Sequence, residues 1–369
     1  MTAARIAPPA LTIRAIRTTA IDVPMRHVLG TSAASVRSAP LLLVDVETEE
    51  GVTGHAYLFC YLPPAAVAIA SFMAEIERLV KGEALDPEAA WPRLAKRFTL
   101  IGVQGPVRMA MAGFDVACWD AWAKAASMPL VRLLGGEPKR LRAYNSNGLG
   151  LMARDALARE AKELLADGFA ALKLRLGYPT LEEDIAAVRT VKDAAGAGVH
   201  VMVDYNQALP LDEALRRGHA LDEAGVYWME EPIRHDDYRG AARLAAEVST
   251  PIQIGENFSQ PAAMEEALHA RACDLVMPDL ERIGGVTGWR QAAAIAAARG
   301  VPMSSHLFPE VSSHLLAVTP TADWLEYVDW AAPILDEPLR IEGGFVRVPD
   351  RPGNGLAWNA EGIRRHRMA

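Results

Sequence analysis

Three acidic residues follow short apolar segments of the sequence at a constant interval. Asp204, Glu230 and Glu256 are separated by 26 residues and then by 26 again, so each falls at the same phase of a repeating unit. Carboxylates brought close together raise one another's pKa, and a hard divalent cation with all-oxygen ligands, Mg²⁺ or Mn²⁺, relieves that repulsion. The spacing therefore favours a metal site over the alternative, three capping or salt-bridged acids at separate helix starts.

A pair of basic residues comes from another apolar segment. Lys173 and Arg175 alternate as residues on a strand do, so both side chains should point to the same face. Beside a metal they could bind a carboxylate, or one of them could move a proton. Two surface cations are the alternative, but the apolar run 169–172 just before them favours a buried strand.

A histidine and two further acids complete the set. His306 and Asp279 end adjacent segments, and a carboxylate hydrogen-bonded to the imidazole would fix its tautomer and raise its basicity. Glu326 lies in the next segment and could donate a hydrogen bond if the site keeps it protonated. A histidine after a strand is often structural, but one that faces a metal across a shared site is a candidate base.

Together these groups fit one reaction. A metal and a cation would hold a carboxylate substrate, a base would remove the weakly acidic proton beside the carboxylate, and the metal would stabilise the enediolate that forms. The basic residues come from two segments far apart in the series, 173–175 and 304–306. They could therefore address the two faces of the same carbon.

These residues end eight short apolar segments that alternate with Ala-rich amphipathic helices. The spacing is about 20 to 30 residues, the length of one strand–helix unit. The segments are Ala143–Ser146, Ala170–Arg175, His200–Asp204, Tyr227–Glu230, Ile252–Glu256, Leu275–Asp279, Pro302–His306 and Trp324–Tyr327. Eight units in series predict an α/β barrel, in which the carboxyl ends of the strands face one site. An open doubly wound sheet is the competing fold, but residues 141–150 contain no GxGxxG loop.

The first part of the chain has a different pattern. Alternating or β-branched apolar residues predict strands over 11–23, 40–48 and 52–58. Helices are expected over 65–80 and 106–126. This part therefore reads as an α+β domain, and the absence of a low-complexity linker predicts close packing on the second domain.

Composition excludes several classes of protein. The 369 residues are 51% hydrophobic and 23% charged, as in ordinary soluble globular proteins, and a net charge of −8 argues against binding to nucleic acid. The longest apolar stretch, Pro64–Ala74, is too short to cross a membrane. Three scattered cysteines, Cys60, Cys118 and Cys273, argue against a disulfide framework and fit a reducing compartment. We therefore expect a cytoplasmic protein.

The ordered motifs resemble those of the enolase superfamily, mandelate racemase subgroup, over nearly the whole chain. They are Lys-x-Arg at 173–175, Asp-Tyr-Asn-Gln at 204–207, Trp-x-Glu-Glu-Pro at 228–232, Gly-Glu-Asn at 255–257, Met-Pro-Asp at 277–279, Gly-Gly-Val-Thr-Gly-Trp at 284–289 and Ser-Ser-His-Leu-Phe at 304–308. The resemblance implies a (β/α)7β barrel over residues 139–339. It also implies an α+β capping domain over residues 1–138, completed by the C-terminal tail 340–369.

The resemblance also implies roles for the candidate residues. Asp204, Glu230 and Glu256 would hold Mg²⁺, and His306, paired with Asp279, would be the base for one face of the substrate. The residues expected near the substrate carboxylate are Lys173, Glu326 as a protonated acid, and Ser146 and Asn206 as further hydrogen-bonding groups.

A lid over this site is expected from the first domain. The resemblance implies that the loop Met25–Thr31, together with Phe59 and Tyr61, forms the lid and the substrate pocket, with Leu29 among the residues that set specificity. The apolar rings of Phe59 and Tyr61 suit an aromatic substrate. Because related proteins are often octamers, a homo-octamer or another homo-oligomer is expected.

One departure from the family pattern bears on the reaction. The racemase of this subgroup has a second lysine, the base for the other face, where this chain has Arg175. A lysine can be tuned toward neutral pH, whereas arginine rarely gives up its proton. The resemblance over nearly the whole chain favours racemisation or epimerisation of a mandelate-like 2-hydroxy carboxylate. The alternative is dehydration of an acid sugar by His306 and Asp279 alone, and a metal-binding relative that has lost catalysis is the third hypothesis.

Overall fold

The computed structural model describes residues 9–32 and 34–368. The N-terminal part holds an antiparallel sheet in which β2 (Ser35–Thr48) lies between β1 (Ile13–Gly30) and β3 (Thr53–Phe59). Residues 39–44 of β2 are all buried, so the middle strand is covered on both faces. The strands expected over 11–23, 40–48 and 52–58 are confirmed, and the first two extend further.

Three helices pack beside this sheet. They are α1 (Pro63–Val80), α2 (Pro87–Phe98) and α3 (Pro106–Ala125), and a 3₁₀ turn, η1 (Thr99–Ile101), follows α2. The central helix α3 is buried over Val107–Ala123, which explains its run of Ala and Met where a surface helix would carry charges. Its first buried acid, Asp115, accepts hydrogen bonds from Thr287 of the second part of the chain and so joins the two parts.

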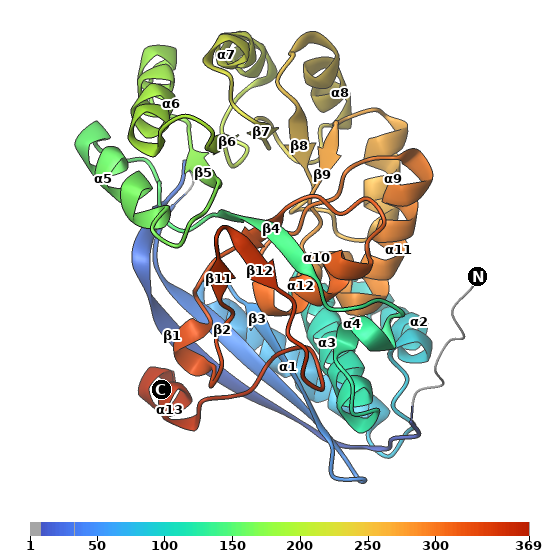
Figure 1. The fold of residues 1–369 in the computed structure, drawn as a ribbon. Helices are drawn as coiled ribbons and strands as arrows, with labels where there is room; N and C mark the ends of the chain where they lie inside the picture. The colour runs from blue at the N-terminus through green and yellow to red at the C-terminus, as the bar shows by residue number, and fades with distance from the viewer. Residues whose placement is uncertain (1–8, 33, 369) are drawn as a thin grey trace.

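A parallel barrel forms the second part of the chain (Figure 1). Its strands run in sequence order, and β10 pairs with β4 in parallel, which closes the ring. The strands are β4 (Arg140–Asn145), β5 (Ala171–Arg175), β6 (His200–Asp204), β7 (Met229–Glu230), β8 (Ile252–Ile254), β9 (Leu275–Val276) and β10 (Leu325–Tyr327). The seventh position of the barrel is filled by residues 302–306, which bridge β9 and the segment before β10 at single positions.

The last barrel segments are shorter strands than the sequence predicts. Pairing in β8 and β9 ends at Ile254 and Val276, before Glu256 and Asp279. The reason is local: Gly255 has a φ of +143°, and Asp279 caps a new helix instead of extending a strand. The departure takes both acids out of the paired strands: Glu256 joins Asp204 and Glu230, and Asp279 pairs with His306.

Helices cover the outside of the barrel, as the arc from α5 to α9 in Figure 1 shows. They follow the strands in turn, which gives the (β/α)7β order. They are α5 (Arg154–Leu164), α6 (Leu181–Ala195), α7 (Leu211–Ala224), α8 (Tyr238–Glu247), α9 (Pro261–His269), α10 (Leu280–Ile283), α11 (Gly285–Arg299) and α12 (Pro309–Val318). The expected α/β barrel with an α+β capping domain is therefore the fold.

The C-terminal tail returns to the first sheet. It contains η2 (Ala332–Ile334), the hairpin β11 (Ile341–Glu342) and β12 (Phe345–Arg347), and α13 (Ala360–His366). The short helix α4 (Leu130–Leu133) connects α3 to the barrel. Tail residues bond to the capping sheet: Asn354 donates to the carbonyl of His55, and the indole of Trp358 donates to Asp45.

The segment expected as a lid loop is mostly strand. Residues 25–30 belong to β1, which pairs with β2 again at Leu29 and Gly30 after a register shift. The arm is tied to the barrel, because Leu151 donates to the carbonyl of Gly30 and His27 bonds to Glu160. The expectation of a loop at 25–31 was wrong in element type over residues 25–30, because β1 continues through them to Gly30. Within 9–32 and 34–368, no helix is long and apolar enough to cross a membrane.

Candidate active site

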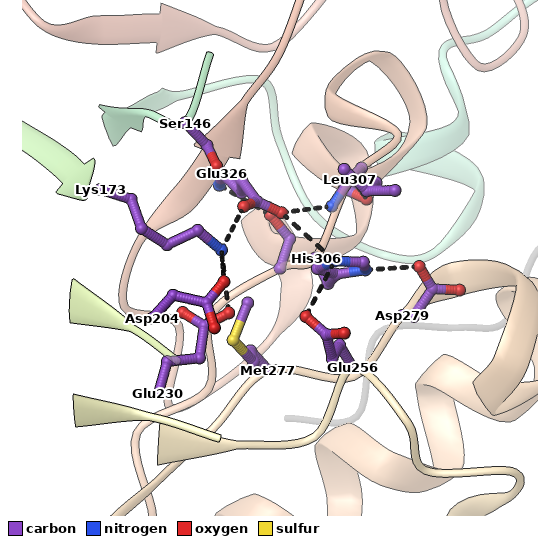
Figure 2. Close-up of polar contacts among 12 residues, drawn as sticks. Ser146, Lys173, Asp204, Glu230, Glu256, Met277, Asp279, His306, Leu307 and Glu326 are labelled. Carbon is purple, nitrogen blue, oxygen red and sulfur yellow. Dashed lines mark hydrogen bonds and ion pairs between the residues drawn. The ribbon is translucent and has the colours of Figure 1, made fainter. Parts of the chain in front are cut away.

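The three acids found by their spacing meet at the carboxyl end of the barrel (Figure 2). Asp204 ends β6, Glu230 ends β7, and Glu256 follows β8. One oxygen of each lies within 4.8 Å of the other two. Asp204 and Glu230 are buried, whereas Glu256 is partly exposed. Three oxygens from neighbouring strands at this separation suit a small, hard divalent cation.

The electrostatics of the three acids agree with such a cation. Burial raises the pKa of Asp204, and it raises the pKa of Glu230 to about 8. For Glu256, burial acts in the same direction, but His306 and Arg282 outweigh it and lower the pKa. Buried carboxylates that are costly to ionise are stabilised by a bound divalent cation. The residues present therefore fit Mg²⁺ in their donor chemistry.

Lys173 lies among three carboxylates of the site. Its Nζ is 2.8 Å from an oxygen of Glu230, 2.8 Å from Glu326 and 3.7 Å from Asp204. Burial would lower the pKa of this ammonium, but the acids raise it above its ordinary value. Lys173 is therefore a permanent cation at the centre of the barrel mouth, placed to attract an anionic group and unsuited to accept a proton.

His306 and Asp279 form the expected pair. His306 Nδ1 is 2.6 Å from Asp279 Oδ2, and its Nε2 is turned into the site, 3.3 Å from Glu256 (Figure 2). The other oxygen of Asp279 accepts the backbone N–H groups of Glu281 and Arg282 as the cap of α10. Because both oxygens are fixed, Asp279 orients the imidazole rigidly. Burial lowers the pKa of His306, but Glu256, Glu326 and Asp279 together raise it to about 9.

Glu326 is charged in this structure, which differs from the expected protonated acid. Burial alone would raise its pKa, but Lys173 and His306 lower it below the ordinary range. One oxygen pairs with Lys173 and the other accepts the N–H of Leu307 at 2.7 Å. The sequence places Glu326 beside the other residues but gives no indication that Lys173 would pair with it.

Arg175 faces the first barrel strand. Its Nη1 donates to the carbonyls of Ser146 at 2.8 Å and Gly148 at 3.1 Å, and its Nη2 donates to Ser146 Oγ at 2.9 Å. Its Nε, 4.0 Å from an oxygen of Asp204, has no hydrogen-bond acceptor among the described residues. Arg175 thus holds the loop after β4 in place and keeps one buried N–H next to the carboxylates.

Ser146 and Asn206 are the two further hydrogen-bonding residues expected from the resemblance. Ser146 contacts Arg175, and Asn206 contacts Asp204. Ser146 Oγ accepts from Arg175, which leaves its own proton available to another acceptor. Asn206 donates its backbone and side-chain N–H groups to Asp204, and its Oδ1 is buried without a donor among the described residues. Both residues therefore keep a polar group without a protein partner beside Arg175 and Asp204.

The aromatic residues of the capping sheet come together as the sequence suggests. The ring centroids of Phe59 and Tyr61 are 4.3 Å apart, and Trp330 lies 4.9 Å from Phe59. Trp330 was missed, because it follows the last barrel strand and belongs to no motif at strand ends. The Tyr61 hydroxyl is buried without a partner in the described chain. Leu29 lies in the arm of β1 and is half-buried.

Further buried or partly buried polar residues surround the site and were not predicted as site residues. Asn257 donates its side-chain amide to Glu231, and Arg282 donates to the carbonyl of Glu256 and to Asn257 Oδ1. Glu281 accepts the N–H of Phe59, and burial raises its pKa well above the ordinary range. Their positions in the sequence could have identified them, because each lies within three residues of a predicted metal ligand or of Asp279.

Comparisons with known proteins agree with this geometry. The model described as "Mandelate racemase / muconate lactonizing enzyme, N-terminal domain" matches residues 14–135, and the model described as "Enolase C-terminal domain-like" matches residues 156–362. A crystal structure of an enolase from the alpha proteobacterium bal199 with bound magnesium is 43% identical, covers 97% of this chain and 100% of its own, and has a TM-score of 0.95.

One further relative was crystallised with ligands, and another has a named activity. An enolase from Bradyrhizobium, crystallised with magnesium and mandelic acid, is 38% identical with a TM-score of 0.93, over 98% of this chain and 99% of its own. The L-talarate/galactarate dehydratase of Salmonella typhimurium is 28% identical over 88% of this chain and 82% of its own length. With its fold, its carboxylate triad and its His–Asp pair, the chain belongs to the mandelate racemase/muconate lactonizing enzyme family of the enolase superfamily.

Proposed function

We propose that this protein is a Mg²⁺-dependent enzyme that removes the α-proton of a 2-hydroxy carboxylate with His306 as its single base, and that it dehydrates an acid sugar. The observation that supports this choice is the position of Arg175. Its terminal nitrogens are engaged by Ser146 and Gly148, and a guanidinium does not lose its proton at ordinary pH. A second base is therefore lacking where two-base racemisation needs one.

The metal is proposed to be held by Asp204, Glu230 and Glu256. Their donor set and separation fit Mg²⁺, and the two solved relatives described above contain magnesium. When bound, Mg²⁺ supplies positive charge that stabilises an enediolate.

The substrate carboxylate is proposed to lie near Lys173 and Glu326. Lys173 offers a buried ammonium, and Ser146 offers a hydroxyl proton on the same side of the site. A substrate carboxylate paired with Lys173 would compete with Glu326 for that cation. Glu326 would then gain a proton more readily, because Lys173 is the largest of the groups that lower its pKa. The expected protonated Glu326 would be a property of the complex.

The His306 imidazole would carry the proton through both halves of the reaction. Glu256 and Glu326 are the groups that most raise the pKa of His306 when no metal is bound, so a cation bound at Glu256 and a proton on Glu326 would let the ring lose its proton. Neutral Nε2 would then take the proton from C2, and the two electrons of that C–H bond become part of the enediolate. The imidazolium then protonates the 3-hydroxyl, whose C–O bond breaks with loss of water. The resulting enol takes a proton at C3 and becomes a 2-keto-3-deoxy acid, so the atoms balance without an oxidant or reductant. Asp279 holds the ring in position during both transfers.

Racemisation is the second candidate. The rings of Phe59, Tyr61 and Trp330 suit an aromatic substrate better than a polyol, and the Bradyrhizobium relative was crystallised with mandelic acid. It would require a proton route to the second face that does not use a neutral Arg175. A relative that binds metal but has lost catalysis is the third candidate.

The deciding experiment follows the C2 proton. The protein is incubated with Mg²⁺ in D₂O with acid sugars and with both enantiomers of aromatic 2-hydroxy acids, and proton NMR and semicarbazide absorbance are recorded. We expect a keto product from an acid sugar of one C2 configuration, and loss of both exchange and product in His306→Asn. Loss of the C2 signal from both enantiomers without a keto product would support racemisation instead. Silence with every acid, while Mg²⁺ binds, would support the third candidate.

Three further expectations stay predictions. They are the domain bounds 1–138, 139–339 and 340–369, the homo-octameric or other homo-oligomeric state, and the cytoplasmic location. Size-exclusion chromatography with light scattering tests the oligomeric state directly.

A further inference from the structure

A cavity of about 340 Å³ adjoins the candidate active site and shares residues with its surroundings. Its lining includes Tyr61, Gln104, Gly105, Arg108, Ser259 and Arg282. Two of these residues are arginines, and no carboxylate lines the cavity within the described chain. The cavity therefore has a positive lining that the proposed reaction does not use.

Arg108 is the unusual residue of this cavity. The residue is 6% exposed, and its guanidinium makes one hydrogen bond, from Nε to the carbonyl of Val103 at 3.1 Å. Within 9–32 and 34–368, its two terminal nitrogens have no hydrogen-bond or ion-pair partner, and its only other contact of note is the face of Trp91. Burial lowers the pKa of Arg108 to about 10, and no nearby acid opposes that effect. The terminal nitrogens of Arg108 are not among the fully enclosed polar atoms of the described chain, so water or an anion in the cavity can reach them.

The guanidinium of Arg282, unlike that of Arg108, has hydrogen-bond acceptors at a terminal nitrogen. Its Nη1 donates to the carbonyl of Glu256 and to Asn257, and its guanidinium lies over the ring of Tyr61. Burial lowers its pKa, but Tyr61, Asp279, Glu256 and Glu281 raise it above the ordinary value. Arg282 therefore adds positive potential to one wall of the cavity, while Arg108 supplies free donors at another.

The N-terminus of α3 opens at the same place. Gly105 precedes the helix without a side-chain cap, and the first turn contains no acid. The N–H groups of Val107 and Arg108 have no acceptor among the described residues. A 20-residue helix places a partial positive charge at this end, where anions are stabilised.

We propose that this cavity binds a small oxyanion, either a free inorganic anion or the carboxylate end of a small acid. Arg108 would hold it by its two free nitrogens, and the first turn of α3 would donate backbone N–H groups. Gln104 and Ser259 supply further neutral donors in the lining. The volume is at the lower end of the range for small-molecule sites, which suits an anion of a few to about ten heavy atoms.

The anion would lie next to the reaction centre without sharing its contacts. Tyr61, Asn257 and Arg282 are common to the cavity and to the surroundings of Glu256. Lys173, which is proposed to receive the substrate carboxylate, does not line the cavity. Binding at the cavity should therefore persist when the metal is removed.

Isothermal titration calorimetry with sulfate tests the proposal on the full-length protein, both in EDTA and with Mg²⁺. We expect binding in both conditions. Arg108→Met should weaken it by about tenfold or more, because a charged hydrogen-bond donor is lost. Arg108→Lys, which keeps the charge without the fork, should give a smaller loss. Arg132→Met, which removes an exposed arginine paired with Glu137 and Asp350, is the control and should not change it.

Three outcomes would overturn the proposal. They are no heat of binding with sulfate or with succinate, binding that requires Mg²⁺, and unchanged sulfate affinity in Arg108→Met. If Arg108→Met does not fold, the lysine variant and the two metal conditions still decide. Tighter binding of succinate than of sulfate, sensitive to Arg108, would identify the ligand as a carboxylic acid, and the reverse would identify an inorganic anion.

Discussion

Charge compensation between single residues organises the barrel mouth. Lys173 pairs with Glu230 and Glu326, and His306 is placed between Asp279 and Glu256. Each of these side chains would be costly to bury alone, and each is balanced by a neighbour from a different strand. Removing one of them therefore changes the protonation of the others as well as its own contact.

Replacing one of the proposed metal ligands should weaken Mg²⁺ binding. Glu256→Gln removes one of three negative charges whose oxygens lie within 4.8 Å of one another, so Mg²⁺ affinity should fall by at least about tenfold. Isothermal titration calorimetry with Mg²⁺ measures the change. Glu247→Gln, in the exposed pair with Arg243, is the control. Equal Mg²⁺ affinity in Glu256→Gln and the unmodified protein would remove Glu256 from the ligand set.

Close contacts between elements fix the frame around these residues. Strand β3 touches α3 at Gly54, where an added Cβ would overlap the carbonyl oxygen of Ala117 and lie 2.8 Å from the backbone nitrogen of Ala121. A second contact joins α12 to α4 through His314, whose Nδ1 accepts the N–H of Val131 at 3.2 Å. The first contact requires glycine, because a Cβ does not fit there. The second requires a side chain that can accept a hydrogen bond from the backbone of Val131.

The β3–α3 contact predicts a steric effect. Gly54→Ala should destabilise the fold by about 1–3 kcal/mol or more, because two backbone segments must separate. Urea unfolding followed by circular dichroism gives the value. Thr53→Ala, in the same strand, should cost less. A Gly54→Ala protein as stable as the unmodified chain would mean that β3 and α3 are not in this contact.

The α12–α4 contact predicts a pH effect. Burial, assisted by Arg351, lowers the pKa of His314 to about 3, below its ordinary value near 6.5. The unfolded chain therefore binds this proton first. The contribution of His314 to stability is present above about pH 6.5 and is lost as pH falls toward 3, by at most about 1.4 kcal/mol per pH unit.

His314→Asn should reduce this loss of folding stability at acid pH. Unfolding free energies from urea titrations between pH 7 and pH 4 should fall less steeply in the variant than in the unmodified protein. His219→Asn changes an exposed histidine and serves as the control. Parallel curves for His314→Asn and the unmodified protein would show that His314 does not titrate in this window.

At the scale of the whole molecule, one buried acid joins three parts of the chain. Asp120 of α3 accepts the N–H of His55 in β3 at 2.7 Å and the N–H of Asn354 in the tail at 2.6 Å, and it pairs with Lys124. The side chain of Asp120 is fully buried. The capping sheet, its central helix and the C-terminal tail therefore share one polar centre, and the tail completes the first domain.

Asp120→Ala should weaken all three connections together. Two backbone N–H groups and an ammonium would lose their acceptor, at a cost of about 3–5 kcal/mol. Asp120→Asn keeps one acceptor oxygen and should cost less. Thermal unfolding with a probe on the tail measures both variants. A loss below about 1 kcal/mol in Asp120→Ala would mean that the tail is held by its apolar contacts alone.

The sequence by itself determined the barrel and the members of its site. Equal spacing of Asp204, Glu230 and Glu256 follows from the strand–helix repeat, so local periodicity was enough to bring them together. Position at strand ends likewise identified Lys173, His306, Asp279 and Glu326. These inferences needed only the rule that the carboxyl ends of barrel strands share one face.

Only the tertiary structure decided which partners these residues take. Three contacts depend on segments far apart in the chain. Ser146 and Gly148 accept hydrogen bonds from Arg175, Lys173 pairs with Glu326, and Trp330 packs beside Phe59. The unpaired state of Arg108 also depends on such segments, and no pattern in residues 101–110 indicates it. The physical reason is that the charge and protonation of a buried group depend on what surrounds it, and distant elements supply those surroundings.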